Sequence, residues 1–475
     1  MKTHKLDPCH YYTLPGLSWD AMLRFTGIEL ELLTDYEKFM MIEKGIRGGL
    51  CQVSHRHIKA NNKFMKTFDS TAESVFIAFV DCNNLYGLAM SKPLPFGDFQ
   101  WINLSMNDLL ESKEGDEYGY ILEVDVSYPS SLHVDHCDLP FLPEQISIGI
   151  DQKKLCAHVN SRKQYIVHYI ALKQAVEHGL IVEKIHRALR FKQSCWLQPY
   201  IEHNTRLRTC SKNAFEKDMY KLYINSVYGK TMENVRERFN MQIVCSDRKM
   251  EKMIRKPEFI DRTIFSENLV AIHLKKKKIM LDKPIYIGQA VLDISKTVMY
   301  NFHYNVMIPK YGNENIKLAY TDTDSLLYKI VTDDLYDDIY NMIEHFDTSD
   351  YPIDHPCYSL VNKKVLGKFK DEANSKIILE FVGLRAKMYS IRMNDHEIKK
   401  AKGVQSAALN KYITFDDYLN CLSLNNDHRL INTCIRSKEH HVYTVDINKK
   451  ALCSKDDKRI VLEDGISTLP IGYKN

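Results

Sequence analysis

The sequence contains no apolar run that approaches the roughly 18–20 residues needed to cross a lipid bilayer. Residues 1–12 also lack the apolar centre of a secretory signal. The 12 cysteines include no CxxC pair, which argues against a structural zinc site and against a disulfide framework. These absences favour a chain with reduced thiols in an intracellular compartment and without a membrane partner.

Internal repeats, low-complexity tracts and a strong charge of either sign are absent as well. The 65 basic and 61 acidic residues leave a net charge of +4, which neither requires nor excludes a polyanionic partner. A hydrophobic content of 44% with 27% charged residues is typical of a folded globular chain. At 475 residues, the length predicts about three domains.

Apolar runs and turn residues predict the main helices and strands. Residues 75–80 form a short apolar run that ends at Asp81, as expected for a buried strand. Asn213 and Glu216 have the spacing of a capping box and predict a helix over residues 214–230. We also expect helical periodicity over 30–40, a helix over 161–178 that Gly179 stops, a helical hairpin over 196–230, a helix over 290–303 and a β-hairpin over 317–328.

Three aspartates, Asp81, Asp322 and Asp324, lie at the ends of predicted strands. Carboxylates that converge repel one another unless cations bind them, and hard oxygen ligands favour Mg²⁺. Two such ions about 4 Å apart can hold the attacking and leaving oxygens of a phosphoryl transfer. The simpler alternative for Asp322 and Asp324 is that they only form a turn through Asx hydrogen bonds.

One face of the second helix in the predicted hairpin carries groups that suit a nucleotide. At 100° per residue, Lys217, Lys221, Asn225 and Tyr228 lie within about 80° of one another. An ammonium group such as that of Lys221 suits a triphosphate, and an aromatic ring next to Gly229 can pack on a base. The alternative is a solvated helix face that ends in a tyrosine.

Three other residues extend this hypothesis. Arg208 and Lys212 precede the helix cap and add positive charge in the turn or the earlier helix. Tyr86 lies five residues after Asp81. Its ring either packs between the strand and the next helix, or lies under a sugar and excludes a 2′-hydroxyl, which selects deoxynucleotides.

Together these residues resemble the family B DNA polymerases, most closely the protein-primed branch of small bacteriophages and virus-like DNA transposons, the organellar and viral type. Five motifs occur in the family's order: YxGG over 46–49 with Ile46 in place of the tyrosine, DxxxLY over 81–86, KxxxNSxYG over 221–229, YxDTDS over 320–325 and KxY over 387–389. The resemblance covers the chain from residue 46 onward.

The resemblance implies a DNA-directed DNA polymerase that adds deoxynucleotides to a primer 3′-hydroxyl and releases pyrophosphate. Asp81 and Asp324 would be the principal ligands of two Mg²⁺ ions, with Mn²⁺ as a substitute and Asp322 as a third acid of the site. The implied nucleotide-binding residues are Tyr86, Arg208, Lys212, Lys221, Asn225 and Tyr228. The implied DNA-binding residues are Gly48 and Gly49 for the template and Lys387 and Tyr389 for the primer.

The implied fold class is α+β, a right-hand polymerase with a palm of antiparallel strands, helical fingers and a small thumb. The expected units are an exonuclease-domain remnant at 1–45, palm at 46–92 and 284–390, fingers at 191–235, thumb at 391–475 and two insertions at 93–190 (TPR1-like) and 236–283 (TPR2-like). The second insertion holds the Lys275–Lys278 run, for which a solvated loop tip and a contact to the DNA backbone stay open.

The N-terminal part departs from the full-length relatives, which carry a proofreading exonuclease there. A lone Asp20 in this segment cannot hold two ions, so we expect no 3′–5′ exonuclease activity in this chain. The chain would then be a fragment, a degraded element or a truncated gene product. Two alternatives to a polymerase are a catalytically inactive DNA-binding relic and a two-metal nuclease of the ribonuclease H type, which has no use for the motif over 221–229.

The expected partners follow from the resemblance. They are a DNA template-primer, deoxynucleoside triphosphates and, as in protein-primed members, a terminal protein that supplies the first hydroxyl. The primer type, the processivity and the host or element stay open, as does the choice between nucleus, cytoplasm and virion.

Overall fold

The computed structural model describes residues 4–148, 152–438 and 441–474 of the chain. A six-stranded sheet forms its centre, and all neighbouring strands are antiparallel except β15 and β16. The strand order is β1 (Cys51–Val53), β13 (Ile316–Asp322), β14 (Ser325–Val331), β3 (Val75–Cys82), β16 (Phe369–Asp371) and β15 (Phe346–Asp347).

Strand β3 is apolar at every position from Val75 to Val80 because both of its faces are covered. Phe76 belongs to the main core, which includes residues of α3 (Leu85–Met90) and α9 (Ile285–Asn301). Phe79 faces the other way, into a second core with β17 (Ile378–Arg385) and β18 (Met388–Met393). The strand that ends in Asp81 is therefore held firmly from both sides.

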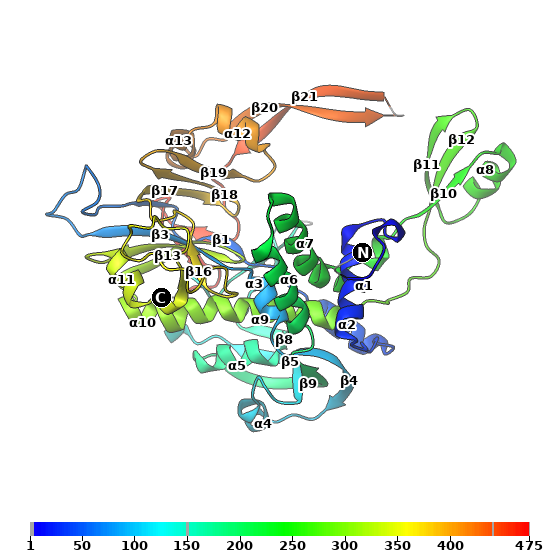
Figure 1. Ribbon diagram of the computed structural model, residues 1–475, viewed down its shortest axis with the longest axis horizontal. Coiled ribbons are helices and arrows are strands. Elements are labelled where there is room, and N and C mark those ends of the chain that lie inside the picture. The colour runs from blue at the N-terminus through cyan, green and yellow to red at the C-terminus, as the bar shows by residue number, and fades with distance from the viewer. Residues whose placement is uncertain (1–3, 149–151, 439–440, 475) are drawn as a thin grey trace.

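A long helix and a pair of helices flank this sheet (Figure 1). Helix α9 continues through a π-helical turn (Phe302–Met307) into α10 (Ile308–Tyr311). Helices α6 (Gln198–Cys210) and α7 (Ala214–Thr231) stand side by side, and α1 (Leu14–Thr26) packs on them. Two shorter helices are α2 (Tyr36–Gly45) and α11 (Leu335–Asn341). Single 3₁₀ turns occur at Pro8–His10, Ser130–Leu132, Val235–Glu237 and Ile343–His345.

Two further units have sheets of their own (Figure 1). A four-stranded sheet in the order β4 (Leu94–Ile102), β9 (Ile181–Ser194), β5 (Tyr118–Ser127) and β8 (Arg162–His168) carries α4 (Met106–Glu111) and α5 (Tyr169–Glu177), with the hairpin β6 (Glu144–Ser147) and β7 (Lys153–Cys156) next to it. A small lobe extends outward and comprises β10 (Asn240–Val244), α8 (Asp247–Ile254), β11 (Phe259–Ser266) and β12 (Leu269–Leu274) around its own apolar core.

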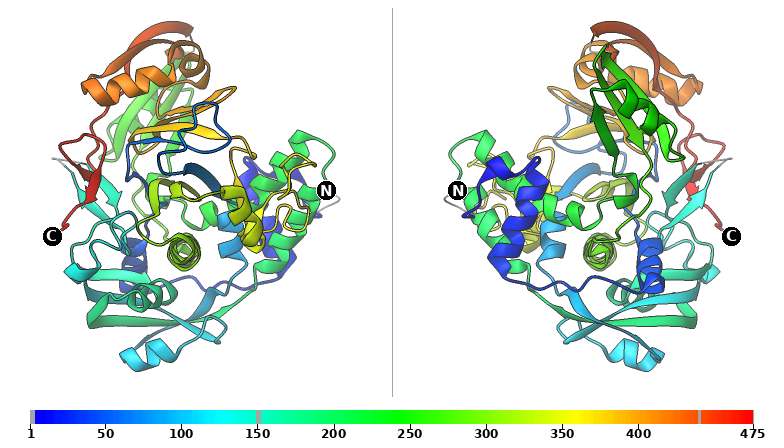
Figure 2. Two further views of the ribbon diagram at one scale, coloured as in Figure 1. Left: turned by 90° about the vertical axis from the view of Figure 1, so that its left-hand side faces the viewer. Right: turned by 90° about the vertical axis from the view of Figure 1, so that its right-hand side faces the viewer.

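The part of the chain from residue 378 to residue 452 lies over the central sheet on the side opposite to the four-stranded β4–β8 sheet (Figure 2). Its sheet has the order β19 (Glu397–Ala401), β18, β17 and β2 (His57–Lys59). It is covered by α12 (Ser406–Tyr412) and α13 (Phe415–Leu424) and continues into the long hairpin of β20 (His428–Lys438) and β21 (His441–Leu452) and the short pair β22 (Arg459–Val461) and β23 (Thr468–Pro470).

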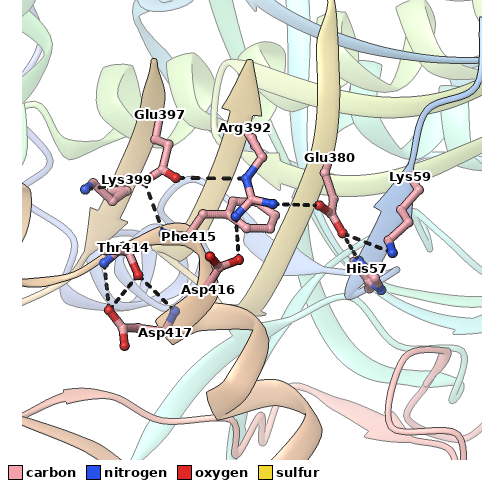
Figure 3. Close-up of polar contacts among 10 residues, drawn as sticks. All are labelled: His57, Lys59, Glu380, Arg392, Glu397, Lys399, Thr414, Phe415, Asp416 and Asp417. Atoms are coloured by element: carbon pink, nitrogen blue, oxygen red, sulfur yellow. Dashed lines mark hydrogen bonds and ion pairs between the residues drawn. The ribbon is translucent and has the colours of Figure 1, made fainter. Parts of the chain in front are cut away.

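A network of paired charges ties this C-terminal sheet together (Figure 3). The Glu380 carboxylate on β17 lies 2.8 Å from His57 Nε2 and 3.8 Å from Lys59 Nζ, both on β2. Its other oxygen lies 3.4 Å from Arg392 Nη1 on β18. Arg392 also pairs with Asp416 at the start of α13, at 2.5 Å. One carboxylate thus links two neighbouring strands to β17, and Arg392 joins the helix to them.

Most of the expected elements are confirmed. Strand β3 contains Asp81, and β13 and β14 form the expected hairpin. The helical hairpin consists of α6 and α7, with Asn213 Oδ1 accepting a hydrogen bond from Glu216 N at 2.8 Å. The second half of the expected capping box is wrong, because the Glu216 carboxylate accepts instead from Lys212 N at 3.2 Å.

Two expectations are wrong in extent. The helix expected over 161–178 begins only at Tyr169, because residues 162–168 pair with β5 and bury the apolar end of β8 against the core. The helix then ends at Glu177, and Gly179 adopts φ +92° as expected for a residue that stops a helix. The helical periodicity over 30–40 gives a helix only from Tyr36, where Asp35 caps α2.

Two of the expected unit limits fall inside strands, residue 190 in β9 and residue 391 in β18. Within the described ranges, no helix combines the length and the apolar character that a bilayer span requires.

Candidate active site

The central sheet brings two of the three aspartates side by side. Asp81 on β3 lies directly opposite Ser325 on β14, and Cys82 N donates a hydrogen bond to the backbone oxygen of Asp324 at 2.7 Å. The turn between β13 and β14 is tight, because Thr323 adopts φ +63° and its N–H donates to Leu50 O at 2.8 Å. The hairpin tip is thus fixed next to the end of β3, as the sequence predicts.

Asp81 and Asp324 repel each other across this junction. Burial, together with the charges of Asp324 and Glu372, raises the pKa of Asp81 to about 8, although Lys221 and Lys370 oppose the shift. Burial also raises the pKa of Asp324. Neither carboxylate has a side-chain hydrogen bond or ion pair with the described residues. Two close, uncompensated carboxylates are a suitable oxygen ligand pair for a divalent cation.

Asp322 has a different environment. Its two carboxylate oxygens lie 2.6 and 2.8 Å from Lys387 Nζ, and Oδ2 also accepts from Tyr320 OH at 3.2 Å. Asp322 is therefore neutralised by the lysine of the KxY motif. In the part of the chain that the structure describes, no set of three or more His, Cys, Asp or Glu side chains is arranged to hold a metal ion.

A cleft of about 360 Å³ opens next to Asp81 and Asp324. Helix α7 contributes Lys221 and Asn225 to its lining, and α6 contributes Arg208. The central sheet and its loops contribute the opposite wall, with Lys364, Lys370 and Glu372 among others. Asp81 and Asp324 thus share the cavity with four cations, and Asp347, Asp350 and Glu372 line it as well.

Most of these cations have no counter-ion. The side chains of Arg208, Lys221 and Lys364 form no ion pair with any residue in the described ranges, whereas Lys370 Nζ lies 2.6 Å from Asp350. Unpaired cations that face one another need an external anion to compensate their charge. The cleft therefore suits a polyanionic ligand.

Tyr86 lines the cleft and is backed by a second aromatic ring. Tyr86 on α3 stacks on Tyr228 of α7, with ring centroids 4.4 Å apart and planes 21° from parallel. Burial and the neighbouring Tyr228 raise the pKa of the Tyr86 hydroxyl well above its usual range, so the hydroxyl is neutral. Asn225, one turn before Tyr228, has a buried Oδ1 without a partner among the described residues. These three groups therefore present an uncharged surface beside the charged one.

Lys212 lies apart from these residues. It is absent from the lining of the cleft, and its backbone N–H donates a hydrogen bond to the Glu216 carboxylate. Sequence reasoning also missed Lys364, Lys370 and Glu372. Lys370 lies opposite Asp81 on the neighbouring strand β16, a pairing between residues almost 300 positions apart that no local pattern could reveal.

The segment of the YxGG-like motif supports the hairpin tip. A Cβ on Gly49 would overlap the Thr323 side chain, so only glycine allows this close approach. Gly48 has open space where a side chain would lie. Arg47 between β1 and α2 is buried, with its guanidinium 3.8 Å from the Tyr165 ring and Nη1 donating to Ile166 O at 2.6 Å. Gly49 thus allows the close packing that fixes the turn between Asp322 and Asp324, whereas Gly48 leaves open space at the surface.

The KxY residues lie on the other side of Asp322. Lys387 adopts φ +58° at the turn between β17 and β18 and reaches Asp322. The Tyr389 ring is buried against Tyr320, with centroids 4.7 Å apart. The motif is therefore joined to the acidic hairpin by both of its named residues.

Comparisons with known proteins agree with this arrangement. Residues 3–308, more than half of the chain, match the family described as "DNA polymerase type B, organellar and viral". No curated protein matches the sequence.

Solved structures of Phi29 DNA polymerase resemble the fold, which confirms the α+β class. The polymerase in the complex with primer-template DNA and incoming nucleotide is 16% identical in sequence to this chain and has a TM-score of 0.58. The match covers 93% of this chain and 68% of the Phi29 polymerase chain. The complex with primer-template DNA alone has the same identity and coverages and a TM-score of 0.56. An orthorhombic crystal form is 15% identical, again with coverages of 93% and 68%, and has a TM-score of 0.57.

Proposed function

The chain belongs to the organellar and viral family of type B DNA polymerases and is a DNA-directed DNA polymerase; from this premise we propose that it extends a primer 3′-hydroxyl with two divalent cations at Asp81 and Asp324. The observation that carries the proposal is the junction of β3 with the β13–β14 hairpin. It leaves two carboxylates without a partner in the described chain, at one end of a cleft with uncompensated cations.

Asp81 and Asp324 would hold the cations, with Mg²⁺ as the natural choice for carboxylate ligands and Mn²⁺ as a substitute. Such ions, when bound, stabilise the attacking and leaving oxygens of an in-line displacement at the α-phosphate. Asp322 would act through Lys387, whose ammonium group it orients. The protein's own contribution is positioning and charge neutralisation rather than covalent catalysis.

The incoming deoxynucleotide would occupy the cleft. Lys221 and Arg208 would bind its phosphates, because they lack counter-ions and line the cavity next to the acids. The stacked Tyr86 would lie under the sugar and exclude a 2′-hydroxyl, while Tyr228 and Asn225 would support the base end. Lys212 is not among the residues that line the cleft, so the proposal gives it no contact to the nucleotide.

The template and primer would run past the two motifs beside the acidic hairpin. Lys387 and Tyr389 would face the primer strand, and Gly48 and Gly49 would allow close approach of the template. The expected arrangement of palm, fingers and thumb, with a remnant of an exonuclease domain at 1–45, is part of the same proposal. A terminal protein that supplies the first primer hydroxyl is also part of the proposal. So is a reducing compartment, which agrees with the 12 cysteines, all of them free thiols.

Primer extension tests the proposal. A labelled primer on a DNA template, with all four deoxynucleotides and MgCl₂, should be extended by the purified chain and stay unextended when EDTA is present. A folded protein that binds the template-primer but adds no nucleotide in either Mg²⁺ or Mn²⁺ would instead support the inactive DNA-binding relic.

A further inference from the structure

The loop between β15 and β16 carries a lysine that sequence reasoning missed. Asp347, at the end of β15, accepts a hydrogen bond from Lys364 N at 2.7 Å, and the same oxygen accepts from Asn83 Nδ2 at 2.7 Å. Asn83 lies two residues after Asp81, and its backbone pairs with this loop through Lys368 O at 2.8 Å. The loop is therefore fastened to the segment that carries the catalytic carboxylate.

The backbone of this loop is set in an uncommon conformation. Lys364 adopts φ +58°, a left-handed conformation that costs a lysine free energy and that the Asp347 bond holds. Gly367 adopts φ +80°, and a Cβ there would lie 2.6 Å from Leu88 of α3, so the loop packs tightly on the helix that carries Tyr86. Lys364 is consequently presented from a rigid support rather than from a loose loop.

The Lys364 side chain lines the cleft from the wall opposite α6 and α7. It has no anionic partner in the described chain, and burial together with the positive charges of Lys217 and Arg208 lowers its pKa. Its neighbour Lys370 differs, because Asp350 already neutralises it at 2.6 Å. Lys364 is thus a half-buried cation that faces other cations across a cavity, and the nearby Asp350 offsets their charge only in part, so a bound anion would stabilise it further.

The order of charges along the cleft indicates which part of a ligand reaches Lys364. Lys221 acts on the pKa of both Asp81 and Asp324, so it lies near the acids. Lys364 is instead influenced by Lys217 and Arg208, which lie closer than Lys221 to the turn between α6 and α7. A triphosphate whose α-phosphate is at the acids therefore extends its outer phosphates toward Arg208 and Lys364.

We propose that Lys364 binds the outer phosphates of the incoming nucleotide, from the wall opposite Arg208, and that it supplies the contact expected of Lys212. This inference rests on the proposed function. It adds a ligand contact from the loop after β15, so that the triphosphate is held from both walls of the cleft.

The test compares Lys364→Gln with Lys363→Gln, which removes the neighbouring exposed lysine outside the cleft. Two readouts are measured: KM for the deoxynucleotide in primer extension, and the nucleotide concentration that half-saturates a gel-shifted complex of protein with a chain-terminated primer-template. The second readout needs no chemistry. Lys364→Gln should raise both values about tenfold, with kcat and the affinity for DNA alone nearly unchanged. Lys363→Gln and the charge-preserving Lys364→Arg should stay within about threefold of the wild type.

Several outcomes separate this inference from the proposed function. Values for Lys364→Gln within twofold of the wild type would overturn it, and so would a loss confined to binding of DNA without nucleotide. If the wild type forms the nucleotide-dependent complex but extends nothing, the proposed function fails while the complex still tests Lys364. If Lys364→Gln melts at a lower temperature, Lys364→Asn replaces it, because asparagine tolerates the left-handed backbone better.

Discussion

The cleft beside Asp81 and Asp324 and the C-terminal sheet use charged side chains in opposite ways. In the sheet, Glu380 has three basic side chains within 4 Å, and Arg392 has acidic partners on three elements (Figure 3). In the cleft, Asp81 and Asp324 repel each other, and Arg208, Lys221 and Lys364 form no ion pair in the described chain, whereas Lys370 pairs with Asp350.

The paired charges of the sheet contribute to the stability of the fold, whereas the unpaired charges of the cleft suit a bound ligand. Paired charges in a sheet connect elements and contribute to folding, since each partner is neutralised within the chain. Uncompensated charges of one sign oppose folding and persist only where a ligand supplies the missing charge. Substitutions in the cleft should therefore reduce activity without reducing stability, and those in the network should do the reverse.

The largest effect is expected for Asp324→Asn. The substitution removes half of the carboxylate pair, so the rate of nucleotide addition in a single-turnover primer-extension assay should fall at least about a thousandfold. The thermal unfolding midpoint should stay at or above that of the wild type, because a repelled charge is lost. Asp333→Asn, an exposed aspartate beyond the far end of the hairpin, should retain the wild-type rate. Retained turnover in Asp324→Asn would remove the metal role.

A smaller loss is expected when the Asp322–Lys387 pair is broken. Asp322→Asn and Lys387→Gln should each reduce extension about thirtyfold, because each removes a charge-assisted hydrogen bond at the place where the primer is proposed to lie. The double variant should be no worse than either single variant, since the two residues act as a unit. If Asp322 were instead a direct metal ligand, its substitution would match Asp324→Asn and exceed Lys387→Gln.

The network in the C-terminal sheet gives the matching prediction on stability. Glu380→Gln removes a buried carboxylate that pairs with Arg392 and contacts His57, so the free energy of unfolding should fall by about 2 kcal/mol in urea denaturation. Asp416→Asn removes a mostly exposed partner of Arg392 and should cost less than about 1 kcal/mol. Both variants should keep the wild-type KM for nucleotide at 25 °C. A raised KM would show that the network also shapes the cleft.

The sequence revealed the parts of the site that are local. The runs around Asp81 and Asp322 predict the strands, and the Asn213 cap predicts α7, because such signals depend on neighbouring residues. The adjacency of Asp81 and Asp324 was an inference from convergence, and it is confirmed by strand pairing across more than 240 positions.

What the sequence could not reveal depends on long-range packing. The first half of the expected helix over 161–178 is a strand because β5 provides the edge it pairs with. Asp322 and Lys387 form one unit only because the β17–β18 turn reaches the hairpin tip. Lys364 and Lys212 look alike in the sequence, and only the fastening of the loop by Asp347 places one of them in the cleft.

The uncharged wall of the cleft is expected to control the choice of sugar rather than the rate. Tyr86→Val removes the ring that stacks on Tyr228 and opens space beside the sugar. The ratio of kcat/KM for deoxynucleotides over ribonucleotides should fall about tenfold. Tyr86→Phe keeps the ring and should keep the ratio. An unchanged ratio in Tyr86→Val would assign sugar selection to another group.

The smallest effect concerns the lobe of residues 240–278, which holds ten basic and five acidic residues. In its lysine run, Lys277 Nζ pairs with Glu258 at 2.7 Å, whereas Lys276 is exposed and has no side-chain partner in the described ranges. If free cations mark the contacts to DNA here as well, Lys276→Gln should lower the slope of log Kd against log salt by about 0.9, and Lys277→Gln should lower it less. Equal slopes in both variants and the wild type would make the run a solvated loop, because a lysine that releases no counterion on binding contacts no phosphate.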